Sequence, residues 1–139
     1  MSETKRPDDG RSADGQAGEI SAFADLPATD FAHELVGADH GEVPFSLILV
    51  AAPPGAGPAL HRHPYAEVFV VEHGRAAFQL GNEEFVVERD HVVVCPPEMP
   101  HGFRNAGSDE LRLTSIHGAD RFRTEWLGAS DTAWTSRPH

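Results

Sequence analysis

The stretch GAGPALHRHPYAEVFVVEHG, residues 55–74, carries two closely spaced histidines and a glutamate directly after a Gly/Pro-rich run. His61 and His63 are two residues apart, so on a β-strand both imidazoles point to the same face. Pro64 bends the chain after them and removes a backbone donor. Glu67 then opens the apolar segment VFVV, where a buried carboxylate without a partner would be costly. Either a metal ion or exposure to water would remove that cost, so the stretch is read either as surface residues or as metal ligands.

A fourth possible ligand, His101, follows the apolar run HVVVC and the proline-rich turn PPEMP. Neutral imidazoles and an ionised carboxylate suit a borderline divalent metal. Together with His61, His63 and Glu67, His101 would leave open positions on a five- or six-coordinate metal for water, O2 or a substrate. The chain has nine histidines, however, and a single histidine is usually a surface or hydrogen-bonded residue.

The surrounding sequence predicts an all-β fold. From about residue 29, eight or so short apolar segments follow one another, with Gly, Pro and Asn between them. Gly81-Asn82 lies between two strand-like runs and predicts a two-residue hairpin turn. In the segment DFAHELVG, alternation places Ala32, Glu34 and Val36 on one face. Such spacing is typical of an antiparallel sandwich or barrel.

The two ends of the chain are predicted to differ from this pattern. Residues 1–19 are polar and rich in Gly, Asp and Ser, which predicts a disordered tail. Residues 20–128 are predicted to form a single domain, and residues 129–139 a C-terminal tail. Before that tail, Asp120 can cap a short helix over RFRTEWL, with Phe122 and Trp126 on one face and Gly128 ending it.

Composition excludes several classes of partner. The chain of 139 residues has 11 basic and 22 acidic residues, a net charge of -11, which argues against binding to nucleic acid or to an anionic membrane. No apolar run approaches the roughly 20 residues that span a bilayer. The N-terminus has no hydrophobic signal region, and the single Cys95 cannot form an intramolecular disulfide. These features favour the cytoplasm.

The quoted stretch resembles the first motif of the cupin superfamily, with Gly55, His61, His63, Glu67 and Gly74 at the spacing of that motif. The segment DHVVVCPPEMPHGFRN, residues 90–105, resembles the second motif. It keeps Pro96, His101 and Asn105, whereas Asp90 and Glu98 stand in place of the motif's two glycines.

The resemblance implies a small jelly-roll β-barrel with a metal inside, bound by His61, His63, Glu67 and His101. It also implies a homodimer, because small single-domain cupins often pair. Fe(II) is the favoured metal, and Mn, Ni, Co, Cu or Zn are alternatives.

Fold and ligands leave the reaction open. We expect an oxygenase acting on a metal-chelating organic substrate, with Glu67 also serving as the base that deprotonates it. The alternatives are a redox-neutral isomerase, cyclase or lyase, with His117 or Glu98 as proton carrier, and a binding protein without turnover. The side chains predicted to wall the substrate pocket are Phe45, Leu47, Phe78, Phe103 and His117.

Overall fold

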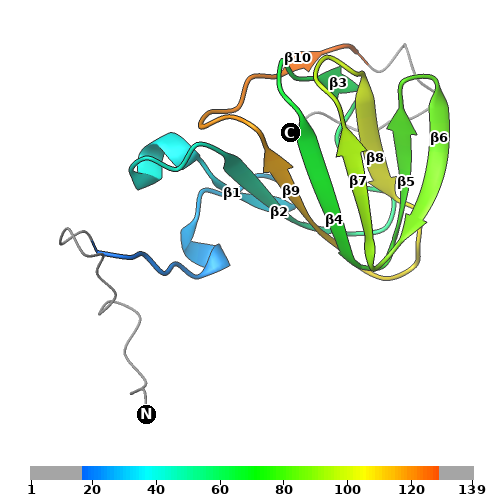
Figure 1. Ribbon diagram of the computed structural model, residues 1–139. Coiled ribbons are helices and arrows are strands. Elements are labelled where there is room, and N and C mark those ends of the chain that lie inside the picture. The colour runs from blue at the N-terminus through cyan, green and yellow to red at the C-terminus, as the bar shows by residue number, and fades with distance from the viewer. Residues whose placement is uncertain (1–16, 129–139) are drawn as a thin grey trace.

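Two five-stranded antiparallel sheets pack face to face in the computed structural model, which describes residues 17–128 (Figure 1). The strand orders are β1-β2-β9-β4-β7 and β10-β3-β8-β5-β6. The predicted all-β fold is therefore confirmed. The elements are, in chain order, the 3-10 helix η2 (Phe23–Asp25), β1 (Ala32–Leu35), the 3-10 helix η3 (Gly37–His40), β2 (Ser46–Ala52), β3 (His61–Arg62), β4 (Glu67–His73), β5 (Arg75–Leu80), β6 (Glu83–Glu88), β7 (His91–Cys95), β8 (His101–Asn105), β9 (Leu111–His117) and β10 (Glu125–Trp126).

The first sheet presents its inward-facing residues in rows, because neighbouring strands pair in register and side chains alternate between faces. We name three of them. The polar row is Ser46, His117, Glu67 and Cys95. The middle row is Glu34, Ile48, Ser115, Phe69 and Val93. The apolar row is Ala32, Val50, Leu113 and Val71. Polarity thus rises from one end of the sandwich towards the other.

Three buried phenylalanines join the two sheets beneath the polar row. Phe69 of β4 contacts Phe78 of β5 and Phe103 of β8, with ring centroids 5.0 and 5.9 Å apart, and Phe78 lies 5.4 Å from Phe103. Each buried phenylalanine contributes about 1.5–3 kcal/mol, and each ring pair about 0.5–1.5 kcal/mol more. This cluster anchors the strands that carry the polar row.

Turns at the predicted positions have left-handed backbone conformations. Gly81 joins β5 to β6 with φ 61°, as the Gly-Asn pair predicts, and Gly74 joins β4 to β5 with φ 86°. Asp90 and Glu98, which replace two glycines of the second motif, also have positive φ, 68° and 67°. The backbone therefore keeps a glycine-like conformation at both positions without a glycine.

The predicted C-terminal helix is wrong, since Glu125 and Trp126 form β10, which pairs with Arg62 and His61 of β3. A helix of two turns is marginal by itself, because few backbone bonds offset the cost of nucleation. The extended chain instead gains ladder bonds, an Arg62–Glu125 ion pair of 2.9 Å, and a bond of 3.0 Å from the Leu127 N–H to the Leu60 carbonyl.

The predicted tails lie almost entirely outside the described residues. Glu19, the last residue of the predicted N-terminal tail, lies within them, and its carboxylate is 2.8 Å from His40 Nδ1. Residues 129–139 are not described, and the boundaries of the 20–128 domain stay predictions. Within the described residues, the structure has no helix long and apolar enough to cross a membrane.

Candidate metal centre

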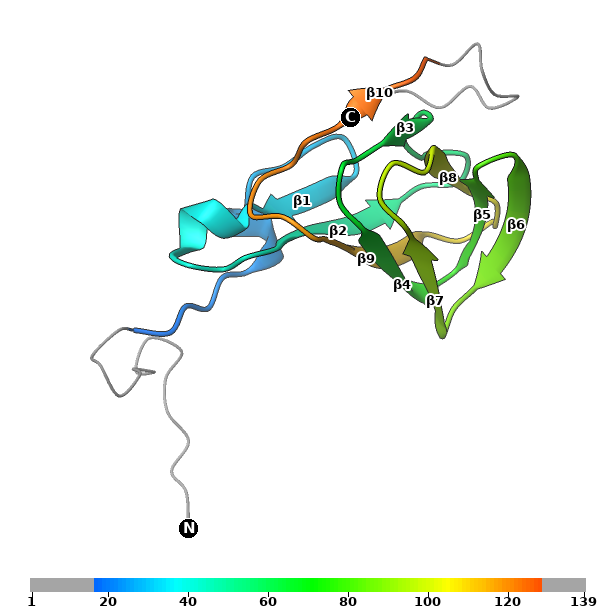
Figure 2. The same cartoon turned by 45° about the horizontal axis from the view of Figure 1, so that its top comes forward.

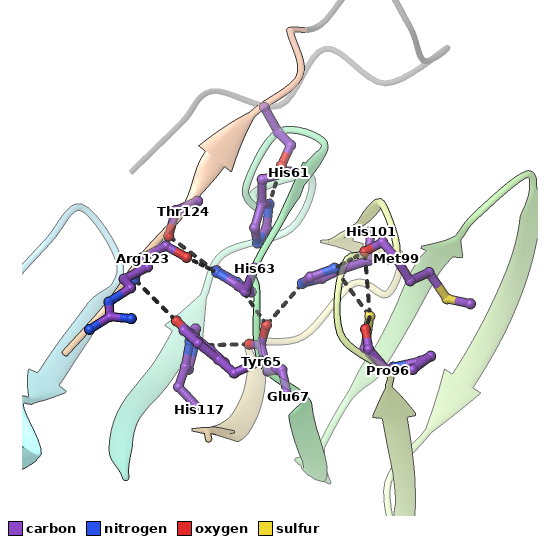
Figure 3. Close-up of polar contacts among 12 residues, drawn as sticks. His61, His63, Tyr65, Glu67, Pro96, Met99, His101, His117, Arg123 and Thr124 are labelled. Atoms are coloured by element: carbon purple, nitrogen blue, oxygen red, sulfur yellow. Dashed lines mark hydrogen bonds and ion pairs between the residues drawn. The ribbon is translucent and has the colours of Figure 1, made fainter. Parts of the chain in front are cut away.

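The four predicted ligands converge at the end of the sandwich that carries the polar row (Figure 3). His61 lies in β3, His63 follows it, Glu67 begins β4 and His101 begins β8. One ligand atom from each residue lies within 4.8 Å of the others, and all four residues are buried. Pairing of His61 with His101 across β3 and β8 brings the two sequence motifs together.

Backbone carbonyls orient the three imidazoles of this group. Nδ1 of His61 lies 2.6 Å from the Ala59 carbonyl, and Nδ1 of His101 lies 2.8 Å from the Met99 carbonyl. Nδ1 of His63 lies 2.9 Å from the carbonyl of Arg123. A carbonyl only accepts, so each Nδ1 donates, and a neutral ring then carries an unprotonated Nε2. This is the tautomer that a metal-binding histidine needs.

In the resulting contacts, hydrogen-bond acceptors face one another: the carboxylate of Glu67 meets the unprotonated Nε2 atoms of two histidines. Glu67 Oε1 lies 3.1 Å from His63 Nε2 and 2.9 Å from His101 Nε2. His63 Nε2 is buried and has no hydrogen-bond partner among the described residues. Lone pairs that face one another in a buried site need a cation between them, either a proton or a metal ion. Three imidazole nitrogens and one carboxylate oxygen fit a divalent transition metal.

The protonation states of two ligands also suit a metal. Burial, helped by the neighbouring His101, lowers the pKa of His61 to about 3, so this ring is neutral at physiological pH. Burial by itself would raise the pKa of Glu67. The contacts of the carboxylate with His101, His117 and His63 outweigh burial and hold that pKa well below its ordinary value. The site therefore combines a neutral imidazole with an ionised carboxylate.

A second layer of contacts, which the sequence reasoning missed, holds Glu67 from the other side. Tyr65 Oη lies 2.7 Å from His117 Nδ1, and His117 Nε2 lies 3.0 Å from Glu67 Oε2. The tyrosine ring stacks on His63 at an interplanar angle of 9°. Burial raises the pKa of Tyr65 to about 12, so the hydroxyl keeps its proton and can donate it to His117. Tyr65 has a signal in the sequence, since it stands two residues from both His63 and Glu67.

A cavity of about 240 Å³ adjoins the metal ligands. Its wall is mainly apolar, with polar groups at the ligands, on β1 and β9, and just before β10. The lining residues are Glu34, Ile48, Val50, Pro58, His61, His63, Glu67, Phe69, Phe103, Ser115, His117, Phe122, Thr124 and Trp126. Phe122 and Trp126, expected on one face of a helix, both line the cavity from an extended segment, and Trp126 contacts His61 at 4.8 Å between ring centroids.

Two of the predicted pocket residues, Phe103 and His117, line this cavity, and three do not. Phe45 is 42% exposed. Leu47 lies on the outer face of its sheet, because the neighbouring Ser46 and Ile48 face inward. Phe78 is fully buried in the phenylalanine cluster.

Comparison of the whole chain with known proteins gives relatives of several kinds. In sequence, the chain is 41% identical over 61 residues to the polyketide synthase CurC of Streptomyces cyaneus, which covers 43% of this chain and 40% of that protein. It is 32% identical over 69 residues to the uncharacterized protein MJ1618 of Methanocaldococcus jannaschii, covering 49% of this chain and 55% of that one. The chain thus spans about half the length, or less, of these curated relatives.

Solved structures share the fold. A variant of oxalate decarboxylase from Bacillus subtilis superimposes with a TM-score of 0.68 at 20% identity, over 81% of this chain and 34% of that one. An uncharacterized protein with a double-stranded β-helix domain from Klebsiella pneumoniae superimposes with a TM-score of 0.63 at 18% identity, over 78% of this chain and 96% of that one. The family model of the cupin domain matches residues 48–117, which contain all four converging ligands. The chain therefore belongs to the cupin family.

Proposed function

We propose that this protein is a metal-dependent enzyme that acts on a small, metal-chelating organic molecule, with oxygenation as the favoured reaction. The observation that carries the proposal is the group of three imidazoles and one carboxylate beside a largely apolar cavity. Four protein ligands leave two positions on a six-coordinate ion, which suit a chelating substrate, or one substrate oxygen together with O2. A bound Fe(II) would supply redox chemistry with O2, and Mn, Ni, Co or Cu would be alternatives. Zn would instead suit a redox-neutral reaction, as a Lewis acid.

The protein's own groups have separate tasks in this proposal. The Ala59, Arg123 and Met99 carbonyls hold the three imidazoles as neutral ligands. The phenylalanine side chains of the wall exclude water from the bound substrate. Glu67 retains the predicted role of base. Its Oε1 faces the ligand histidines, whereas Oε2 contacts His117 and is the atom that would accept a proton from a substrate hydroxyl.

Two relatives support this proposal at a general level. The oxalate decarboxylase of Bacillus subtilis has Mn(II) centres, which favours a divalent metal in a site of this fold. The relative named as a polyketide synthase favours a role in the chemistry of small organic molecules. We further propose that the protein works in the cytoplasm, because a single cysteine suits a reducing compartment. Its net charge of -11 favours a small molecule over nucleic acid or a membrane as its partner.

A redox-neutral isomerase, cyclase or lyase is the second candidate. Such a reaction needs a proton carrier besides the metal ligands. The two carriers predicted from the sequence are poorly placed, since His117 is held between Tyr65 and Glu67, and Glu98 has a side chain 64% exposed near Arg62. Glu34, in the cavity wall, is the observation that keeps this candidate open.

Elemental analysis of protein purified without a chelator or histidine tag tests the proposal. We expect near-stoichiometric iron, manganese, nickel, cobalt or copper in the native chain and almost none in a His61→Ala/His101→Ala double variant. The matched control is a His73→Ala/His91→Ala variant, which removes two exposed histidines of the same sandwich. Stoichiometric zinc would favour the redox-neutral candidate. A native chain that neither contains nor takes up metal would refute both.

A further inference from the structure

The cavity wall contains a second carboxylate, Glu34, besides the ligand Glu67. Glu34 belongs to β1 and to the middle row, where Ile48 is its cross-strand neighbour and Ser115 lies one strand further. Its side chain is partly buried, and its carboxylate makes no hydrogen bond or ion pair within the described part of the chain. Glu67, in contrast, contacts three histidines. Glu34 is thus the carboxylate of this wall that is available to a ligand.

The position of Glu34 costs free energy that the fold does not recover. Burial raises its pKa, and the nearby His117 opposes that rise only in part. An unpaired carboxylate in a mostly apolar wall loses hydration without gaining a partner. Ile48 and Phe69 in the same row show that an apolar side chain would suit the wall. A costly group at a place where the fold does not need it indicates a functional role.

Glu34 lies on β1, the edge strand of the first sheet. β1 and β10 are edge strands, and Figure 2 shows them on the same side of the sandwich. The wall at this side is formed by Glu34 from β1 and by Thr124 and Trp126 from the segment around β10. A molecule bound to the metal would therefore extend from His61, His63 and Glu67 towards these residues.

The volume and the lining of the cavity limit the size and shape of the molecule that can bind in it. About 240 Å³ is below the roughly 300–1,000 Å³ typical of pockets for drug-sized ligands, so a single ring fits better than several. Four aromatic side chains face this space, from β4, β8 and the segment of β10: Phe69, Phe103, Phe122 and Trp126. Aromatic walls favour a flat, unsaturated ligand.

We infer that Glu34 is the specificity residue of this cavity, and that it accepts a hydrogen bond from a hydroxyl or amino group at the end of a one-ring substrate remote from its metal-binding oxygens. This inference rests on the proposed function, because the metal fixes the other end of the substrate. A carboxylate rejects an anionic group by repulsion and favours a donor or a cation.

Three catechol probes test the inference, since they share the chelating end and differ only at the far end. These are catechol, 4-(2-aminoethyl)catechol and 3,4-dihydroxyphenylacetate, titrated calorimetrically under argon into Mn(II)-loaded protein. We expect the amino probe to bind about tenfold more tightly than the carboxylate probe, as a single charged hydrogen bond allows. In Glu34→Gln the ratio should fall to about threefold or less, with the manganese content unchanged.

The control variant is Glu42→Gln, which removes an exposed carboxylate and changes the net charge equally. It should keep the native ratio, because Glu42 is not among the residues that line the cavity. The two variants have the same net charge, so general attraction of a cation to the acidic protein affects both equally. An equal ratio in the native protein and Glu34→Gln would overturn the inference alone. Catechol that binds metal-loaded and metal-free protein equally would overturn the proposed function, and the inference with it.

Discussion

At the scale of single residues, the inner face of one sheet holds two glutamates in opposite electrostatic settings. Glu67 lies in the polar row among three histidines, which hold its pKa well below the ordinary value despite burial. Glu34 lies one row away beside apolar neighbours, and burial raises its pKa. Pairs of titratable groups driven in opposite directions are typical of functional sites. The low-pKa group fits a metal ligand, and the raised one fits contact with a substrate.

The raised pKa of Glu34 predicts a pH-dependent gain in stability when the carboxylate is removed. A raised folded-state pKa stabilises the fold below the unfolded value of 4.5, and this stabilisation is lost as pH rises through the folded value. Glu34→Gln should therefore be more stable than the native chain at pH 7.5, and the difference should shrink towards pH 4. Urea unfolding of both proteins without metal measures this, and a gain that does not depend on pH would contradict it.

Tyr65 is predicted to strengthen metal binding without touching the metal. It donates to His117 Nδ1 at 2.7 Å, and His117 in turn contacts Glu67 Oε2 at 3.0 Å. Tyr65→Phe keeps the ring that stacks on His63 and removes only the hydroxyl. Removal of such an outer partner commonly weakens metal binding about 10–100-fold, and we expect the lower end of that range. Competition with a chromogenic chelator gives the affinity; an unchanged value would show that Glu67 needs no support from His117.

At the scale of elements, the sequence predicted those features that depend on local spacing. His61 and His63 share a face because they are two residues apart, and Gly81 forms its turn because a left-handed backbone is needed there. The face of β2 was less predictable, since SLILVAA has apolar residues on both sides. Ile48 and Val50 turned out to line the cavity, rather than Leu47.

The segment around β10 was mispredicted for a different reason. Phe122 and Trp126 have helical spacing, but the edge of β3 offers Trp126 and its neighbours Glu125 and Leu127 backbone partners from a distant part of the chain. Propensity in a short segment is weak compared with such tertiary pairing. Glu34 shares a face with Ala32 as the alternation predicts, yet the pattern gave no sign that this face borders a cavity.

The turn before β8 predicts a stabilising substitution. Glu98 has φ 67°, a region that costs a residue with a Cβ roughly 1–2 kcal/mol. Glycine would remove this strain, at an entropic cost of about 0.5–1 kcal/mol in the unfolded chain. The bond of 2.7 Å from the Glu98 N–H to the His63 carbonyl belongs to the backbone and would remain. Glu98→Gly should thus stabilise the protein by about 0.5–1 kcal/mol.

Chemical denaturation of a matched pair measures this effect. Glu83→Gly removes an exposed glutamate from the regular strand β6 and should destabilise the protein by about 0.5–1 kcal/mol. If both glycine variants lose stability to a similar degree, strain at residue 98 is not the dominant contribution.

At the scale of the whole molecule, the outer face of the first sheet is largely apolar, although the chain has a net charge of -11. One row crosses all five strands in register and consists of Leu35, Leu47, Ile116, Val68 and Val94. The adjacent row adds Leu49, Val70 and Val92, together with the uncharged polar residue Thr114 and His33 at its edge. Val92 and Val94 are each 61% exposed. An apolar surface across a whole sheet is typical of a protein interface rather than of a monomer surface.

A second copy of the chain is the occupant that we predict for this face, in line with the homodimer expected from the sequence. The two rows contain no aspartate, glutamate, lysine or arginine, so two acidic copies can meet there without opposing like charges. Sedimentation velocity should give twice the mass of one chain for the native protein. Val94→Glu should give a monomer, because it would bury charges at the centre of both facing sheets, and it should fold because the side chain is exposed in one copy.

Val86→Glu is the matched control for this experiment. Val86 is 62% exposed, almost the same as Val94, but it lies on β6 of the other sheet. The control should remain a dimer, because its new charge faces water. Dissociation by Val86→Glu and not by Val94→Glu would place the interface on the second sheet. A native chain that sediments as a monomer at micromolar concentration would show that the valines of the first sheet remain exposed to water, and the predicted homodimer would then be wrong.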